Sequence, residues 1–243
     1  MDIAAIAARN GITMHRAQNS PLPELGTVTG DWTDKPLAII GTGPSLKGFD
    51  FSRFDIAGVR VLAVKEAIWD LPFAEEVFCL HRPWLLDREA ELGALDKRKV
   101  FAVEPEVGRC PVIPNSLYLL RTRHAGYSDK PTEIQSGGNS GFGATNYAYL
   151  KRGTSGRRWR WALFGFDYTD QLGEHYCADR YTWYRPGQNA RYWRSWGDNF
   201  NDCKAQLSRA GIDVMNASPI STVSAFPKCS IDEGIRWLTA ACG

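Results

Sequence analysis

The feature that most constrains this chain is a short apolar run that ends in a glycine-rich turn. Residues 37–40 read Leu-Ala-Ile-Ile, which predicts a buried strand. Gly41 and Gly43 follow at once and permit either a close approach of the backbone to a ligand or a positive φ. Pro44 favours a turn, so free N–H groups and the Ser45 hydroxyl are expected at the carboxyl end of the strand. An ordinary tight turn would explain the same residues.

Further apolar runs predict a sheet with helices on both faces. They lie at residues 59–64, 76–80, 99–103, 116–120, 159–164 and 212–215. Their length and β-branched content suit strands that are covered on both sides. A helix predicted at residues 83–92 separates two of the strands, and this order favours parallel pairing. Further helices are predicted at residues 3–9, 198–209 and 232–241 and directly after Asn139.

These elements predict an α/β protein with a single Rossmann-like domain and a mostly parallel sheet. The domain is expected at residues 36–243, after an irregular N-terminal lead-in at 1–35. Residues 169–195 are polar and aromatic with little periodicity, and a loop that long in a compact domain is usually functional or mobile. We therefore predict a lid there.

Composition and charge limit the classes of protein to which this chain can belong. The net charge of the 243 residues is only +2, so charge alone does not indicate a large phosphate-binding surface. Six cysteines without Cys-x-x-Cys spacing are expected to be reduced thiols. Neither a secretory signal nor a membrane span is recognisable, and a cytoplasmic location is expected.

Polar residues follow two other glycine-rich turns. Asn139 and Ser140 come after Gly-Gly and before small residues that begin with Gly141. Either side chain could simply cap the helix, or the first-turn N–H groups could bind a phosphate together with Ser140. Gly165 ends another apolar run and is followed closely by Asp167.

His175 is the preferred general base because acidic and aromatic neighbours could orient it and tune its pKa. A surface histidine in a polar loop is the plain alternative. His81, which follows the strand predicted at residues 76–80, is the second choice of general base and could line the pocket. The sequence His-Arg-Pro at 81–83 also reads as a simple helix entry. Basic aromatic segments at 181–185 and 191–194 could stack on bases or sugars, whereas the tryptophans in the similar segment at 157–161 are expected in the core.

The order of these motifs resembles the bacterial sialyltransferases that use CMP-sialic acid, and the wider group of pterin-diphosphokinase-like and motility-accessory proteins. The resemblance spans residues 36–225 and also extends to uncharacterised phage-encoded proteins. It rests on Ile-Gly-Thr-Gly-Pro-Ser-Leu-Lys at 40–47, Asn-Ser-Gly-Phe-Gly-Ala at 139–144, Leu-Phe-Gly-Phe-Asp-Tyr at 163–168 and Asn-Ala-Ser-Pro-Ile-Ser at 216–221.

The resemblance implies roles only at matching positions. Gly41, Thr42 and Gly43 would contact the nucleotide. Asn139, Ser140 and Gly141 would hold the ribose or phosphate, and Gly165 would admit the base. Tyr168 would donate to the leaving phosphate, with Tyr176 as a second donor. The family also implies self-association.

Two positions depart from the family pattern. Lys65 stands where the family has Asn, and Trp-Gly-Asp at 196–198 stands where a catalytic histidine is expected. His175 is the candidate to replace that histidine.

The predicted function is transfer of a sugar or related group from a nucleotide-activated donor, CMP-type by preference, to a hydroxyl acceptor. A glycan, a nucleotide or a modified DNA base could be that acceptor. One alternative is a phage-type DNA-modification or nucleic-acid-binding protein built on the same core. Another is Mg²⁺-dependent diphosphotransfer, in which Asp167 with Asp170 or Glu174 would hold the ion. No cofactor and no zinc site is predicted.

Overall fold

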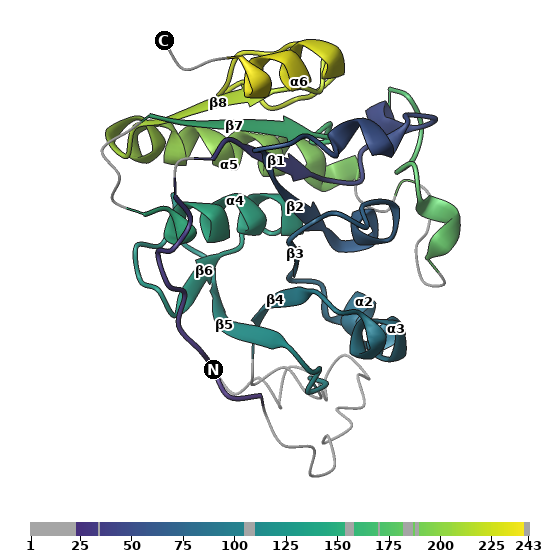
Figure 1. The fold of residues 1–243 in the computed structure, drawn as a ribbon, viewed down its shortest axis with the longest axis vertical. Coiled ribbons are helices and arrows are strands. Elements are labelled where there is room, and N and C mark those ends of the chain that lie inside the picture. Colours follow the sequence, from purple (N-terminus) through teal and green to yellow (C-terminus); the bar gives the residue numbers. More distant parts are fainter. Residues whose placement is uncertain are drawn as a thin grey trace.

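The computed structural model describes residues 23–33, 35–104, 110–153, 158–169, 171–181, 187 and 190–240. It confirms the predicted α/β class: eight parallel strands form one sheet with helices on both faces (Figure 1). The helix predicted at 3–9 lies outside the described residues.

The strands run in the order β6-β5-β4-β3-β2-β1-β7-β8. Their bounds are β1 (Leu37–Ile40), β2 (Arg60–Val64), β3 (Glu76–Cys79), β4 (Arg98–Val103), β5 (Ser116–Thr122), β6 (Glu133–Gln135), β7 (Trp159–Phe164) and β8 (Ile212–Asn216). Every predicted strand is present. β1 pairs with β2 and β7, with Ile40 opposite Ala63 and Phe164.

Helices cover both faces of the sheet. The α-helices are α2 (Arg82–Asp87), α3 (Glu89–Ala94), α4 (Ser140–Lys151), α5 (Ala190–Arg209) and α6 (Ile231–Thr239). Short 3₁₀ helices lie at Pro44–Leu46, Phe51–Phe54, Lys65–Asp70 and Ala178–Arg180. Figure 1 shows α4 and α5 on the opposite side of the sheet from α6.

Alternating strand residues build two cores, as expected for strands buried on both faces. Leu37 and Ile39 pack with residues of α4 and α5, whereas Ala38 and Ile40 pack with the layer that contains α2 and α6. Trp161 is 1% exposed, which confirms its predicted place in the core.

Small residues let α4 lie close to the sheet. A Cβ added at Gly143 would lie 2.8 Å from a ring carbon of Phe78, and Ala144 is completely buried. Only a very small side chain fits there.

Three predicted elements need correction. The helix predicted at 83–92 is two helices, because Arg88 leaves helical geometry with a ψ of 17°. β6 lies in a stretch predicted as loop. α5 begins at residue 190 rather than 198, so its first turns occupy the end of the predicted lid.

The described part of the lead-in belongs to the domain. Gly26 N–H donates to the carbonyl of Tyr118 at 2.8 Å, and Trp32 N–H donates to that of Lys151 at 2.9 Å. Trp32 is 4% exposed in the core. Residues 23–33 therefore pack along β5 and the end of α4.

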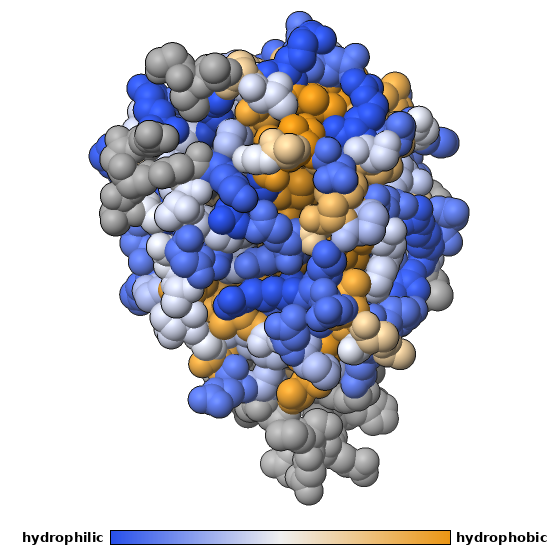
Figure 2. Space-filling view, in the orientation of Figure 1, coloured by the Kyte–Doolittle hydropathy of each residue, from blue (hydrophilic) through white to orange (hydrophobic). Residues whose placement is uncertain are grey.

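Figure 2 shows a largely hydrophilic face, with a hydrophobic area over the part where Figure 1 places β1, β7 and α5. No helix within the described ranges has the length and apolar character that a membrane crossing requires.

Candidate functional site

A cavity of about 260 Å³ lies where the chain reverses its direction across the sheet. The strands progress from β1 outward to β6, and the chain then returns to place β7 beside β1. Loops diverge at the carboxyl ends of such neighbours and leave a crevice, which is the usual ligand site of an open parallel sheet. The lining comes from the residues after β1, β2, β3 and β7, the start of α4, residues 173–181 and the first turns of α5.

Close packing between the turns after β1 and β7 explains the glycines. Gly41 N–H donates to the Phe164 carbonyl at 2.8 Å, and Gly43 N–H donates to the Gly165 carbonyl at 2.9 Å. A Cβ at Gly43 would lie 2.3 Å from Asp167 Oδ2. Gly165 has a φ of +67°. These glycines line the cavity, and contact between two strand ends is sufficient to require them.

Two bulky residues of the lining have positive φ, which is uncommon for such side chains. Lys65 has a φ of 53° and Tyr168 a φ of 48°. The backbone around Tyr168 is held by Thr222, whose N–H donates to the Asp167 carbonyl at 2.9 Å and whose hydroxyl donates to the Tyr168 carbonyl at 3.1 Å. Backbone strain that is held in place in this way is typical of functional sites.

The start of α4 supplies hydrogen-bond donors to the cavity. Asn139 is the N-cap: its Oδ1 accepts from Phe142 N–H at 2.8 Å and from the Tyr168 hydroxyl at 2.7 Å. The Tyr168 hydroxyl and Asn139 Oδ1 therefore form a hydrogen bond with each other. The backbone N–H groups of Ser140 and Gly141 have no acceptor among the described residues. Ser140 Oγ, which lines the cavity, accepts from Leu80 N–H at 3.3 Å.

His175 is held against the end of β1. Its Nδ1 lies 3.0 Å from the Thr42 carbonyl and 3.3 Å from Thr42 Oγ1. A carbonyl can only accept, so Nδ1 carries the hydrogen and Nε2 keeps its lone pair. Burial, together with the charge of Lys65, lowers the pKa of His175 to about 4. The imidazole is therefore neutral near pH 7.

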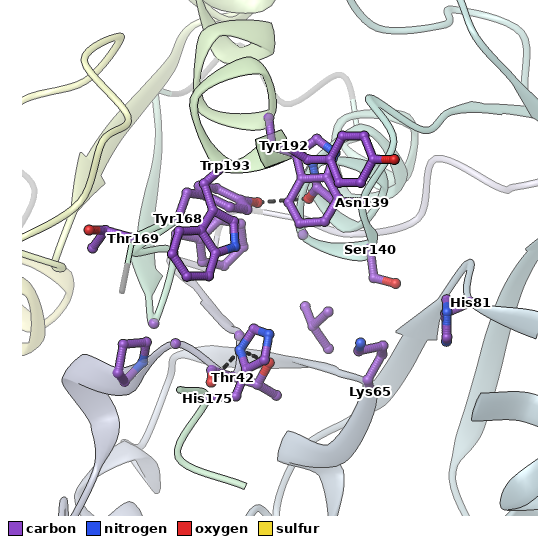
Figure 3. A pocket seen from close by; sticks show the side chains of 18 of the residues that line it. Thr42, Lys65, His81, Asn139, Ser140, Tyr168, Thr169, His175, Tyr192 and Trp193 are labelled. Atoms are coloured by element: carbon purple, nitrogen blue, oxygen red, sulfur yellow. Dashed lines mark hydrogen bonds between the residues drawn. The ribbon is translucent and has the colours of Figure 1, made fainter. Parts of the chain in front are cut away.

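Figure 3 shows how these side chains face one another. Tyr168, Tyr192 and Trp193 lie on one side of the cavity, and Thr42, His175 and Lys65 lie on the other. His81 stands at one end, as predicted for a residue that could line the pocket. Burial and the charges of Lys65 and Arg121 lower the pKa of His81 to about 3.

Three predicted site residues, Ser45, Asp167 and Tyr176, lie outside the lining of the cavity. Ser45 N–H donates to Asp167 Oδ2 at 2.7 Å, and the Asp167 side chain is almost completely buried. Burial raises the pKa of Asp167. The Tyr176 hydroxyl donates to Asp70 Oδ2 at 2.9 Å, away from the cavity. These contacts stabilise the strand ends and the segment that carries His175.

Part of the predicted lid is in contact with the loops that follow β1 and β2. Tyr176 N–H donates to the Thr42 carbonyl at 3.3 Å, and Arg180 binds Asp70 through both guanidinium NH₂ groups at 2.7 and 3.0 Å. Cys177 is completely buried. Residues 176–180 are therefore held against the loops that follow β1 and β2. Residues 170, 182–186, 188 and 189 of the predicted lid lie outside the described residues.

Aromatic side chains from α5 complete the cavity. Tyr192 and Trp196 stack with ring centroids 5.7 Å apart and planes 16° apart, and Trp193 is 9% exposed. The basic aromatic pattern predicted a stacking surface at 191–194, and Tyr192 and Trp193 do line the cavity. Trp196 was noted in the sequence only as a departure from the family pattern. Thr169, which also lines the cavity, was missed; its place just after the end of β7 was the available signal.

The charge of the lining is positive. Lys65 is its cation, and none of the lining residues within the described ranges is acidic. Nor do the described residues hold a group of three or more His, Cys, Asp or Glu side chains suited to a metal ion. Glu174 Oε1, one of the predicted magnesium ligands, accepts from Gly187 N–H at 2.8 Å.

No family model, curated protein or solved structure matches this chain. The resemblance to sialyltransferase-like proteins therefore stays a prediction.

Proposed function

We propose that the cavity binds the nucleotide part of an activated donor and that the protein transfers the donor's sugar or related group to a hydroxyl acceptor. The observation that carries this proposal is the pairing of a neutral imidazole, held by the Thr42 carbonyl, with Lys65 and the free N–H groups of α4 around one cavity. Transfer to a hydroxyl needs both a base and a site for a phosphate leaving group.

The donor phosphate would lie near the start of α4. Backbone N–H groups and the positive end of a helix attract anions there, and α4 is 12 residues long. Lys65 and the Ser140 hydroxyl would add two further donors. These groups would stabilise the negative charge that builds on the phosphate as the bond to the transferred group breaks.

The stacked pair Tyr192 and Trp196 would contact the base or the sugar of the donor. Flat rings offer a large apolar surface with few rotatable bonds, and stacking is tolerant of which base is bound. Specificity for one base would then come from the polar groups around it.

His175 Nε2 would accept the proton of the acceptor hydroxyl. The acceptor oxygen then forms a bond to the donor carbon, and the electron pair of the broken carbon–oxygen bond leaves with the phosphate. A bound anionic donor would raise the pKa of His175 above about 4. The base would become stronger only when the donor is in place.

Diphosphotransfer through Mg²⁺ has less support, because the carboxylate of Asp167 binds Ser45 N–H and lies outside the lining. The DNA-binding alternative depended on Arg185, which lies outside the described residues, and on Arg194. The Arg194 side chain is 95% exposed, and its Nε lies 3.9 Å from Asp198 Oδ2.

Turnover tests the proposal. The protein would be incubated with CMP-, CDP- and UDP-sugars and a panel of hydroxyl acceptors that includes DNA, and free nucleotide and product would be measured by mass spectrometry. We expect release of free nucleotide from one class of donor. His175→Gln should lower kcat by about 100-fold or more while leaving donor binding nearly unchanged. Equal turnover by His175→Gln would contradict the role of this residue as base.

A further inference from the structure

A second cavity of about 370 Å³ lies beside the first at the carboxyl edge of β3, β4 and β5. Leu80 and His81 line both cavities, so the two spaces meet at these residues. The carboxyl edge of a parallel sheet is where ligands bind, and the residues at the ends of β4 and β5 line only the second cavity.

The second cavity is lined by more positive than negative charge. Arg82 and Arg121 line it, and Glu104 is the carboxylate in its lining within the described residues. Glu104 Oε1 lies 3.5 Å from Arg121 Nε and 3.0 Å from an NH₂ group of Arg123. One carboxylate therefore faces two guanidinium groups, and Arg82 adds a third positive charge.

The positive charge of Arg121 is only partly balanced by its surroundings. Its side chain is only 18% exposed, and burial lowers its pKa despite the presence of Glu104. His81, at the junction, stays neutral between Lys65 on one side and Arg121 on the other. An oxyanion placed in the cavity would supply the missing negative charge and could accept two parallel hydrogen bonds from a guanidinium.

We propose that this second cavity binds the carboxylate or phosphate group of an anionic acceptor, beside the donor in the first cavity. The apolar side chains of Leu85, Leu86 and Val103, which also line it, would contact the carbon skeleton of that acceptor. The acceptor role depends on the proposed function, whereas anion binding at Arg121 does not.

The test is a titration followed by NMR of the histidine side chains, of which the chain has only four. Inorganic phosphate and acetate are added separately at pH 7, and the His81 signals are assigned with His81→Gln. We expect a saturable shift of the His81 ring signals. Arg121→Gln, and separately Arg82→Gln, should weaken the binding about tenfold, because each removes a charged hydrogen bond. Arg158→Gln is the matched control, since Arg158 is 72% exposed on another part of the surface.

Each outcome decides the proposal. A response to phosphate alone assigns the cavity to phosphate-bearing acceptors, and a response to both anions includes carboxylates. Unchanged His81 signals, binding that survives both arginine substitutions, or shifts confined to His175 would overturn the proposal. A separate nucleotide titration distinguishes this proposal from the proposed donor site. Anion binding at His81 without nucleotide binding would support the second cavity as an anion site and contradict the donor site in the first cavity.

Discussion

Single residues set the protonation state of the site. His81 and His175 are both largely shielded from water, and both lie near Lys65, so the charged imidazolium is disfavoured at each. Neutral histidines suit proton acceptance, and they also make folding sensitive to pH.

Acidification should destabilise the protein through these two residues. A histidine of the unfolded chain has a pKa near 6.5, whereas the folded values are about 4 for His175 and about 3 for His81. Between these values the unfolded chain binds more protons, so the free energy of unfolding falls as pH falls. The slope approaches about 1.4 kcal/mol per pH unit for each histidine. Urea denaturation at pH 7.0 and 5.5 measures this fall.

The double variant His81→Gln/His175→Gln should lose less stability over the same interval, and the exposed His124→Gln is the control. An equal loss in the wild type and the double variant would show that neither histidine is held neutral by the fold.

At the scale of elements, the segment that carries His175 depends on an anchor whose residues lie outside the lining of the cavity. Asp70 accepts from two NH₂ groups of Arg180 and from the hydroxyl of Tyr176. Arg88 joins this network, because it donates to the Arg180 carbonyl and, through Nε and an NH₂ group, to Glu66 Oε1. Loss of the anchor should free the segment locally.

Asp70→Ala should accelerate tryptic cleavage after Arg180 under native conditions by at least about tenfold, because each hydrogen bond to a charged group contributes about 1.5–3 kcal/mol. Mass spectrometry of the fragments gives the rate. Asp213→Ala is the matched control: Arg158 also binds Asp213 through two nitrogens, but that pair is exposed. If both variants are cleaved at the same rate, the Asp70 contacts do not anchor the segment.

Elements differed in how well the sequence predicted them. β1 and β7 were predicted to the residue, since both are rich in apolar residues and almost entirely buried. β6 was missed because it is only three residues long and two of them are Glu133 and Gln135, so backbone pairing with β5 rather than side-chain pattern defines it. The start of α5 was missed because arginines and aromatic residues hide its helical period.

For the molecule as a whole, the order of the strands brings distant residues into one site. Thr42 and His175 are 133 positions apart and in contact, and β1, which ends just before Thr42, pairs in parallel with β7, which ends eleven residues before His175. Parallel pairing could not predict which side chains would point away from the cavity. Tyr176 follows His175 directly, but its backbone N–H donates to the Thr42 carbonyl and its side chain points to Asp70. Side-chain direction in an irregular segment depends on such tertiary contacts, which no local pattern records.

The central claim is that the first cavity holds a nucleotide, and calorimetric titration with CMP, CDP and UDP tests it most directly. We predict one-to-one binding of at least one of them. Ser140→Ala and Lys65→Asn should each weaken that binding about tenfold, since each removes a donor to the phosphate; asparagine tolerates the positive φ that Lys65 has. Arg53→Gln, on the surface, should bind as the wild type does. Absence of binding to all three nucleotides, or binding that neither cavity variant weakens, would contradict the account.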